Sequence, residues 1–251
     1  MSSGAPNFSL SGQVVLVTGA SYGIGAGLAR SLAAAGAKLA LAARSEARLA
    51  DLARELDGLA VPLDLREVTS IRRGVDAVVE RFGRIDVLVN NAGLGANQAA
   101  LDVTERDWDE LFAVNLRGLF FACQAAALHM LERGYGRIVN MSSQAGAVGI
   151  QNHAVYAASK GGVNQLTRVL ALEWSARGVT VNAVAPTFIE TPGTKDRLDQ
   201  PAFRKSVLDR IPAGRLGTID DVAAAVMYLA SPAAGLVTGT VLNVDGGWTA
   251  Q

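Results

Sequence analysis

Short runs of β-branched and apolar residues alternate along the chain with longer segments in which apolar positions recur at helical spacing. In the segment 219–230, Val222, Val226 and Leu229 follow one another at steps of four and three residues, so they share one face of a helix. The pattern predicts strands at residues 14–18, 38–42, 60–63, 87–90, 137–141, 179–184 and 241–244, and helices at residues 25–35, 46–56, 67–82, 105–131, 156–177 and 219–230.

The predicted strands are apolar at nearly every position, which is typical of parallel strands buried on both faces of a sheet. Because strands and helices alternate and no repeat or change of composition divides the chain, we expect one α/β domain over residues 1–251. Its core is a doubly wound, seven-stranded parallel sheet with helices on both faces. The segment 187–212 is polar, long for a connection and interrupted by proline and glycine. We expect a lid there, although a plain surface insertion would have the same pattern.

Charge and cysteine content exclude several classes of function. The 23 basic and 23 acidic side chains balance, so nothing favours binding to nucleic acid or to an anionic membrane. Cys123 has no partner for an internal disulfide, and His129 and His153 do not have the spacing of zinc ligands. The first residues lack the features of a signal peptide, and no apolar run reaches the roughly 18 residues of a membrane span. We therefore expect a cytoplasmic protein.

A glycine-rich turn follows the first predicted strand, in the sequence TGASYGIG. Gly19, Gly23 and Gly25 permit backbone angles and a close ligand approach that a side chain would prevent. Free N–H groups at the start of the following helix favour a phosphate. A tight turn from strand to helix also uses glycine for geometry alone, but the position after the first strand of a βαβ series favours a dinucleotide site.

The end of the second predicted strand bears on which dinucleotide binds. An acidic residue at this place would hydrogen-bond the ribose of NAD, whereas this chain has Ala43 followed by Arg44. A guanidinium can hold a 2′-phosphate through two charge-assisted bonds, so NADP(H) is favoured. NAD(H) remains the alternative, because Arg44 could face solvent instead and Tyr22 adds no second cation to the glycine-rich turn.

The sequence YAASK places Tyr156 and Lys160 one turn apart on the same face of a predicted helix. Taken alone, this pair would be ordinary helix surface. A free phenol has a pKa of about 10, which is too high for a base near neutral pH. A lysine charge about 5 Å away, at an effective dielectric of about 20, contributes on the order of 3 kcal/mol, or roughly two pKa units. The spacing therefore predicts a tyrosine whose pKa is lowered toward the working range of an acid–base catalyst.

Six short motifs occur in a fixed order among these predicted elements. They are TGASYGIG at 18–25, NNAG at 90–93, NLRG at 115–118, SSQAG at 142–146, YAASK at 156–160 and VDGG at 244–247. With them the chain resembles the short-chain dehydrogenase/reductase family from about Leu10 to Trp248. The resemblance implies a Rossmann-type fold and an NAD(P)(H)-dependent oxidoreductase that interconverts a secondary alcohol and a ketone by hydride transfer.

The resemblance also implies a catalytic tetrad of Asn115, Ser143, Tyr156 and Lys160. Ser143 precedes Tyr156 by thirteen residues, the separation usual in this family, so Ser142 is its structural neighbour. In the family's scheme Tyr156 is the acid–base group, and Ser143 holds the substrate oxygen. Lys160 binds the nicotinamide ribose and lowers the tyrosine pKa, and Asn115 supports a water that connects the lysine to bulk solvent.

Further cofactor contacts are implied along the chain. Asp64 resembles the acidic residue that meets the adenine amino group, although it could instead cap the helix before Glu67. The segment from Pro186 departs from the family because Thr187 stands where glycine is usual, and a β-branched residue does not readily take a positive φ. The implied cofactor-binding set is Gly19, Ser21, Tyr22, Gly23, Ile24, Gly25, Arg44, Asp64, Leu65, Asn91, Ala92, Gly93, Tyr156, Lys160, Pro186, Ile189 and Thr191.

Residues around the tetrad suggest a substrate class. The expected substrate contacts are Ser143, Gln144, His153, Tyr156 and Phe188, with Leu94, Gln151, Asn152 and Glu190 nearby. So many amides favour a polar sugar, a polyol or a small keto compound, although they could also be loop residues that face water. His153 either contacts the substrate or caps the helix.

Two other functions stay open. A 3-oxoacyl thioester reductase is the main alternative, but a carrier-protein partner would need a basic patch, and the helix 67–82 offers only Arg72, Arg73 and Arg81. A nucleotide sensor without turnover is the remote alternative. Such a protein would be expected to lose part of the tetrad, whereas this chain has all four residues.

The helices 105–131 and 156–177 are apolar on more than one face, so part of that surface must be covered. Family members usually pair these helices across a dimer axis. We expect a homotetramer, with a dimer as the fallback.

Overall fold

The computed structural model describes residues 5–250, and in that part of the chain seven parallel strands form one sheet. The strand order is β3-β2-β1-β4-β5-β6-β7, which is the doubly wound order predicted. The strand β6 runs two residues beyond its predicted end, because Ala185 and Pro186 pair with β7. The strands are β1 (Val14–Thr18), β2 (Lys38–Ala43), β3 (Leu59–Pro62), β4 (Val87–Asn90), β5 (Gly136–Met141), β6 (Val179–Pro186) and β7 (Val241–Val244).

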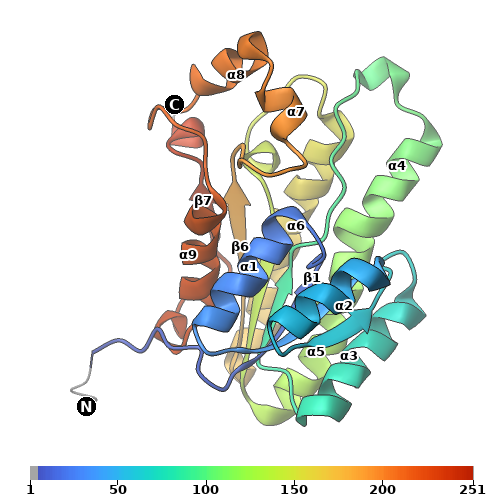
Figure 1. Ribbon diagram of the computed structural model, residues 1–251, viewed down its shortest axis with the longest axis vertical. Coiled ribbons are helices and arrows are strands. Elements are labelled where there is room, and N and C mark those ends of the chain that lie inside the picture. Colours follow the sequence, from blue (N-terminus) through green and yellow to red (C-terminus); the bar gives the residue numbers. More distant parts are fainter. Residues whose placement is uncertain (1–4, 251) are drawn as a thin grey trace.

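Helices cover both faces of this sheet (Figure 1). In β1, Val15 and Val17 belong to the core beneath α1 and α9, whereas Val14 and Leu16 pack beneath α3 and α5. This alternation follows from the two-residue period of a strand and explains why each strand is apolar throughout. The main helices are α1 (Gly23–Ala34), α2 (Glu46–Glu55), α3 (Val68–Phe82), α4 (Glu105–Phe112), α5 (Leu119–Arg133), α6 (Ala154–Trp174) and α9 (Ile219–Ala230).

The long helix predicted at 105–131 is interrupted. A π-helical turn, η2 (Ala113–Gly118), separates α4 from α5. The whole stretch Glu105–Arg133 is long and apolar enough to cross a membrane, but 56% of its apolar window is buried within the fold. Packing of α5 against α3, β4 and β5 accounts for that apolarity.

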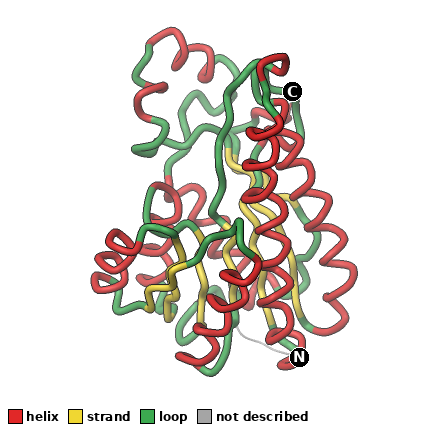
Figure 2. The backbone as a smooth tube through the Cα atoms, turned by 90° about the vertical axis from the view of Figure 1, so that its right-hand side faces the viewer, coloured by secondary structure: helices red, strands yellow, loops and turns green. Residues whose placement is uncertain are grey.

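The expected lid contains regular structure that the sequence pattern did not predict. Two short helices, α7 (Lys195–Leu198) and α8 (Pro201–Leu208), stand beyond the carboxyl ends of the strands (Figures 1 and 2). They enclose a small core of their own, formed by Leu198, Val207, Ile211, Leu216 and Trp248. Because Trp248 comes from the carboxyl-terminal segment, that end of the chain anchors the lid.

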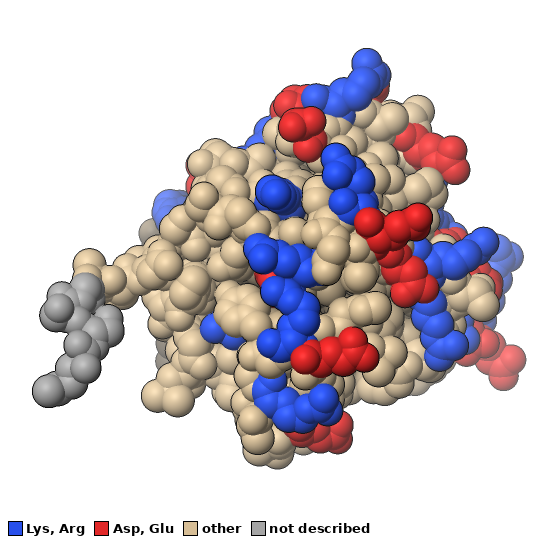
Figure 3. All heavy atoms as spheres, turned by 90° about the horizontal axis from the view of Figure 1, so that it is seen from below, with Lys and Arg blue, Asp and Glu red and all other residues tan. Residues whose placement is uncertain are grey.

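Charges of both signs are interspersed on the face of the described chain seen in Figure 3. Close ion pairs such as Arg30–Glu55 at 2.7 Å and Arg84–Asp86 at 2.9 Å neutralise neighbouring side chains. This mixture agrees with the balanced charge of the sequence.

Candidate active site

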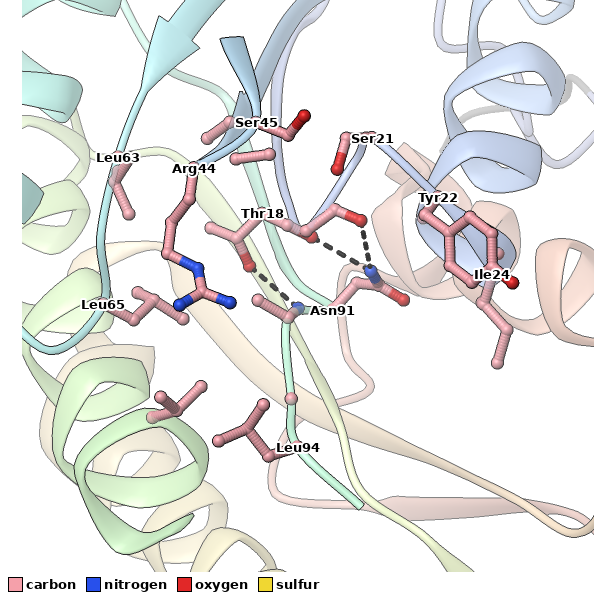
Figure 4. Close-up of a pocket in the computed structure, with 18 of the residues that line it drawn as sticks. Thr18, Ser21, Tyr22, Ile24, Arg44, Ser45, Leu63, Leu65, Asn91 and Leu94 are labelled. Atoms are coloured by element: carbon pink, nitrogen blue, oxygen red, sulfur yellow. Dashed lines mark hydrogen bonds between the residues drawn. The ribbon is translucent and has the colours of Figure 1, made fainter. Parts of the chain in front are cut away.

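The glycine-rich turn packs directly against the end of β4. The Nδ2 of Asn91 donates hydrogen bonds to the carbonyl oxygens of Thr18 (3.0 Å) and Gly19 (3.3 Å), as Figure 4 shows. A Cβ on Gly19, where φ is +67°, would lie 2.7 Å from the Cα of Ala92, and one on Gly25 would lie 2.2 Å from the carbonyl oxygen of Gly19. Only glycine fits at these two positions, so the backbone N–H groups at the start of α1 stay accessible to a ligand.

A cavity of about 720 Å³ opens above this turn, at the carboxyl ends of β1, β2 and β4. Its volume is that of a site for a large ligand, and the glycine-rich turn at its floor is of the kind that binds the phosphates of a dinucleotide. Among the predicted cofactor residues, Gly19, Ser21, Tyr22, Gly23, Ile24, Gly25, Arg44, Asp64, Leu65, Asn91, Ala92, Gly93 and Thr191 line this cavity. Tyr156, Lys160 and Pro186 line a smaller cavity beside it, and Ile189 lines a third.

Two arginines stand at the β2 end of the cofactor cavity. Figure 4 shows the guanidinium of Arg44 directed toward Leu65 at the wall of the cavity, although the residue is also exposed to solvent. Arg48, in the first turn of α2, lines the same cavity, and its Cζ lies 5.9 Å from the centroid of the Tyr22 ring. The sequence interpretation missed this second cation, although the close approach of α2 to the end of β2 could have indicated it.

Asp64 lines the cofactor cavity and does not cap α3, whose N-cap position is Glu67. Its Oδ1 accepts hydrogen bonds from the backbone N–H of Arg66 (2.9 Å) and from the Nε of Arg66 (3.2 Å). Burial would raise the pKa of Asp64, but these bonds and the nearby arginine charges hold that pKa below its ordinary value. The carboxylate is therefore ionised and held in place at the cavity wall.

Asn115 lies on the π-helical turn η2 and is fully buried. Its Oδ1 accepts from the backbone N–H of Leu94 (2.7 Å), while its Nδ2 donates to the Leu94 carbonyl (2.9 Å) and to the Ser159 hydroxyl (3.3 Å). A Cβ on Gly93 would lie 3.3 Å from Asn115 Oδ1 and 3.5 Å from Lys160 Nζ. The widened turn thus places the Asn115 side chain against the segment that follows β4, close to Lys160. Such π-helical turns are frequent at functional sites.

The two serines at the end of β5 have different surroundings. Ser142 donates to Asn164 Oδ1 at 2.6 Å, inside the protein. Ser143 hydrogen-bonds Gln144 Oε1 at 3.0 Å, and its hydroxyl also contacts the phenol of Tyr156. Ser143, not Ser142, therefore lies where it can share a substrate oxygen with the tyrosine.

Tyr156 and Lys160 lie close together on α6, as predicted, but their electrostatics differ from the prediction. Lys160 Nζ is 5.7 Å from the centroid of the Tyr156 ring and donates to the Met141 carbonyl at 2.8 Å. Burial raises the pKa of the Tyr156 phenol, against the opposing hydrogen bond from Ser143. Burial also lowers the pKa of Lys160 to about 8. The predicted lowering of the tyrosine pKa is therefore wrong for the protein alone, because the sequence argument left out desolvation.

The burial of Lys160 has a cost in stability that depends on pH. Below pH 8 the lysine is protonated in both states, so the folded protein bears the full cost; as pH rises from 8 toward the unfolded pKa of 10.5, the cost falls. This cost is on the order of 3 kcal/mol at neutral pH, of which about 1 kcal/mol is offset by the hydrogen bond to Met141.

Replacing Lys160 with methionine is therefore expected to raise the Tm at pH 7 by roughly 5 °C. Thermal unfolding at pH 7 and pH 10 measures this gain, which should shrink at the higher pH.

Lys195→Met is the matched control for that substitution. The side chain of Lys195 is 68% exposed and pairs with Asp199 at 2.6 Å, so its loss should leave the Tm within about 1 °C of the parent. A Lys160→Met protein that is less stable than the parent at pH 7 would contradict the desolvation argument.

A separate cavity of about 500 Å³ lies between the tetrad and the lid. All five predicted substrate contacts, Ser143, Gln144, His153, Tyr156 and Phe188, line it. His153 is at the N-cap position of α6, but its side chain makes no capping bond, and its Nδ1 lies 2.8 Å from the Gln151 carbonyl oxygen.

Some residues expected near the substrate do not line the cavity between the tetrad and the lid, and other residues that were not predicted do line it. Gln151, Asn152 and Glu190 are exposed and outside the cavity lining, and Leu94 faces the cofactor cavities. Most of the predicted amides therefore do face water. The sequence interpretation missed Asn97, Thr187 and Arg197, which line the cavity from the loop after β4, the end of β6 and the lid.

The departure at Thr187 does not strain the backbone. Among the described non-glycine residues, positive φ angles occur at Asp57 and Asn152, and Thr187 is not one of them. Its backbone N–H donates to the Val244 carbonyl at 3.2 Å, which continues the pairing of β6 with β7. Thr187 therefore avoids the positive φ that a β-branched residue does not readily take, because the pairing of β6 with β7 continues through this position.

Comparison with known proteins identifies the family. A family model described as enoyl-(acyl carrier protein) reductase matches residues 19–249. The chain is 42% identical over 249 residues to a D-threitol dehydrogenase of Mycolicibacterium smegmatis, covering 97% of this chain and 95% of that relative. It is 41% identical over 243 residues to a 3-oxoacyl-(acyl-carrier-protein) reductase of Thermotoga maritima, covering 95% and 98%.

A solved structure agrees over nearly the whole chain. The crystal structure of a gluconate 5-dehydrogenase from Burkholderia cenocepacia, in complex with NADP and tartrate, superposes with a TM-score of 0.95 at 38% identity and covers 98% of both chains. With the dinucleotide cavity and the six motifs, these matches show that the chain belongs to the short-chain dehydrogenase/reductase family of NAD(P)-dependent oxidoreductases.

Proposed function

We propose that this oxidoreductase interconverts a secondary alcohol and a ketone in a hydroxyl-rich small molecule, such as a sugar, a polyol or a small keto compound. The observation that carries the proposal is a cavity in which the hydroxyl groups of Ser143 and Tyr156 lie together, and which adjoins the cofactor cavity and shares Ile24 and Thr191 with it. The relatives include a D-threitol dehydrogenase and a gluconate 5-dehydrogenase, both named for hydroxyl-rich substrates.

In this proposal Tyr156 exchanges the proton and Ser143 orients the reacting oxygen. The nicotinamide cofactor supplies or accepts the hydride. In reduction the phenol donates its proton to the oxygen that gains negative charge, and in oxidation the phenolate takes that proton back. Because burial raises the pKa of Tyr156, the proton-donor form dominates at neutral pH. Reduction is thus favoured near neutrality, and oxidation is favoured in alkaline solution.

A substrate panel tests this function. The protein is assayed at 340 nm with NADP⁺ or NAD⁺ against alditols and aldonates, and with the reduced cofactors against ketoses, diketones and acetoacetyl thioesters. Faster turnover of polyols or their keto forms supports the proposal. Preference for the acetoacetyl thioester would support the second candidate, the activity for which the Thermotoga relative is named. Tight cofactor binding without any turnover would point to a sensor.

We further propose that NADP(H) is preferred over NAD(H). Arg44 and Arg48 line one end of the cofactor cavity, and neither forms an ion pair with a described carboxylate. Two unpaired guanidinium groups there suit the 2′-phosphate that distinguishes NADP from NAD. The ratio of kcat/KM for the two cofactors measures this preference.

We also propose that the protein is a homotetramer, with a dimer as the fallback. Leu128 of α5 is 63% exposed and Leu172 of α6 is 82% exposed, while Leu236 after α9 is 98% exposed. Large apolar side chains on two faces of a monomer suit two contacts between copies.

A charge at one of these positions should break the assembly. Leu172→Glu is expected to lower the mass measured by multi-angle light scattering at micromolar concentration, because it would bury an unpaired carboxylate in the contact. Glu173→Gln, an exposed neighbour on the same helix, is the control and should keep the parent mass. A parent protein that is monomeric at this concentration would contradict the proposal.

A further inference from the structure

We propose that Arg197 of the lid binds a carboxylate of the substrate, and that the enzyme therefore selects polyhydroxy acids over neutral polyols. The inference rests on the proposed function, since it names the substrate class of that same site. It assigns a specificity-determining role to a residue for which the sequence pattern gave no signal.

The charge of the substrate cavity is set by a single side chain. Of the described residues that line it, Arg197 is the one with a fixed formal charge, and His153 is the other titratable base. The remaining polar groups, including Gln144, Asn97 and Thr187, are neutral, and no aspartate or glutamate lines the cavity. Such a cavity suits a ligand with hydroxyl groups and one negative charge.

Arg197 differs from the other basic residues of the helices α7 and α8 because no described carboxylate pairs with it. Lys195 pairs with Asp199 (2.6 Å), Arg204 with Glu190 (3.2 Å) and Lys205 with Asp209 (2.7 Å). The Arg197 side chain packs on an aromatic ring instead: its Cζ lies 4.5 Å from the centroid of the Phe203 ring. Stacking on a ring face leaves the N–H groups at the edge of the guanidinium plane free for a planar carboxylate.

The support beneath Arg197 is rigid. The ring of Phe203 meets Phe188 edge-on at 5.7 Å, and Phe188 lies 5.8 Å from Trp248. The next residue of α7, Leu198, is 2% exposed and belongs to the lid core. The half-buried guanidinium is thus held before a ligand arrives, which lowers the entropic cost of binding.

A cofactor phosphate is the competing anion for Arg197. The described lining of the cofactor cavity includes Arg44 and Arg48 but not Arg197, whereas the substrate cavity includes Arg197 but neither of the other two. The arginines are therefore divided between the two cavities, and the division favours a carboxylate on the substrate side.

The test compares alditol and aldonate pairs of equal carbon number: sorbitol with gluconate, galactitol with galactonate, and threitol with threonate. For the pair that is turned over best with NADP⁺, the kcat/KM ratio of aldonate to alditol is measured in the parent, Arg197→Gln and Arg197→Lys. We expect the parent to favour the aldonate, and Arg197→Gln to lower the ratio by about 10- to 100-fold, mainly through KM. Arg197→Lys keeps the charge and should recover part of the ratio.

Controls separate this inference from the function on which it rests. Arg204→Gln, which changes a lid arginine already paired with Glu190, should keep the parent ratio. A parent that prefers alditols, or an Arg197→Gln ratio equal to that of the parent, would overturn the inference and leave the proposed function standing. A raised KM for NADP⁺ with an unchanged ratio would assign Arg197 to the cofactor instead. No turnover of any polyol, aldonate, ketose or diketone would refute the proposed function itself.

A second measurement does not depend on turnover of a polyol or an aldonate. Tartrate and threitol are compared as competitive inhibitors of the reduction of a neutral diketone. The inhibition constant of tartrate should rise by about 10-fold or more in Arg197→Gln, while that of threitol shifts much less. Equal shifts for both inhibitors would show that the substitution distorts the cavity rather than removing an anion contact.

Discussion

Tyr156→Phe is expected to lower kcat/KM by about 10²- to 10⁴-fold in both directions, the usual contribution of a positioned proton donor or acceptor. The phenylalanine keeps the ring that Lys160 Nζ faces at 5.7 Å, and removes only the hydroxyl that contacts Ser143. Steady-state kinetics with the best substrate of the panel measures the loss. Cofactor binding, followed by fluorescence, should stay close to that of the parent.

The pH profile gives a second readout for the same substitution. Burial raises the pKa of Tyr156, so the parent's oxidation rate should climb with pH through the alkaline range as the phenolate forms. The phenylalanine variant should lack this rise, because its remaining activity needs no phenolate.

Tyr135→Phe is the matched control. The Tyr135 hydroxyl is a buried oxygen without a hydrogen-bond partner, and the residue precedes β5 at the end opposite to the tetrad. Its removal should leave kcat/KM and the pH profile unchanged. A Tyr156→Phe enzyme that reduces ketones as fast as the parent would end the proposed mechanism.

Features set by local pattern could be predicted from the sequence. The continuous apolar runs of the strands identify a parallel sheet buried on both faces, and Gly19 and Gly25 of the turn after β1 stand where a Cβ would meet backbone atoms. The pairing of Tyr156 with Ser143 rather than Ser142 followed from their spacing in the family motif. These features depend on short-range geometry that residue type alone constrains.

Features set by tertiary packing could not be predicted in this way. The π-helical turn at Asn115 has no distinctive residue pattern, because it arises where the side chain reaches back to the backbone of Leu94. Lid helices as short as α7 have no useful period, so the position of Arg197 was not accessible. Desolvation of Tyr156 depends on everything packed around it, which is why a pairwise Coulomb estimate gave the wrong direction for the tyrosine pKa.

Cofactor preference should change most when Arg44 is replaced by aspartate. The substitution removes a charge-assisted bond to the 2′-phosphate and adds a repulsive charge, and it supplies the acidic group that favours the NAD ribose. We expect the ratio of kcat/KM for NADP(H) over NAD(H) to fall by about 10²- to 10³-fold. Adding Arg48→Gln should lower it further, since Arg48 is the second cation in the same cavity.

Arg54→Gln provides the control. Arg54 lies on α2, as Arg48 does, but its side chain is 79% exposed and pairs with Asp51 instead of lining the cavity. It should leave the cofactor ratio unchanged. Stronger salt should weaken NADP(H) binding in the parent more than in Arg44→Asp, because an exposed guanidinium–phosphate pair is screened by ions. A parent that uses NAD(H) as well as NADP(H), together with an Arg44→Asp ratio that does not move, would mean that these two arginines do not read the 2′-phosphate.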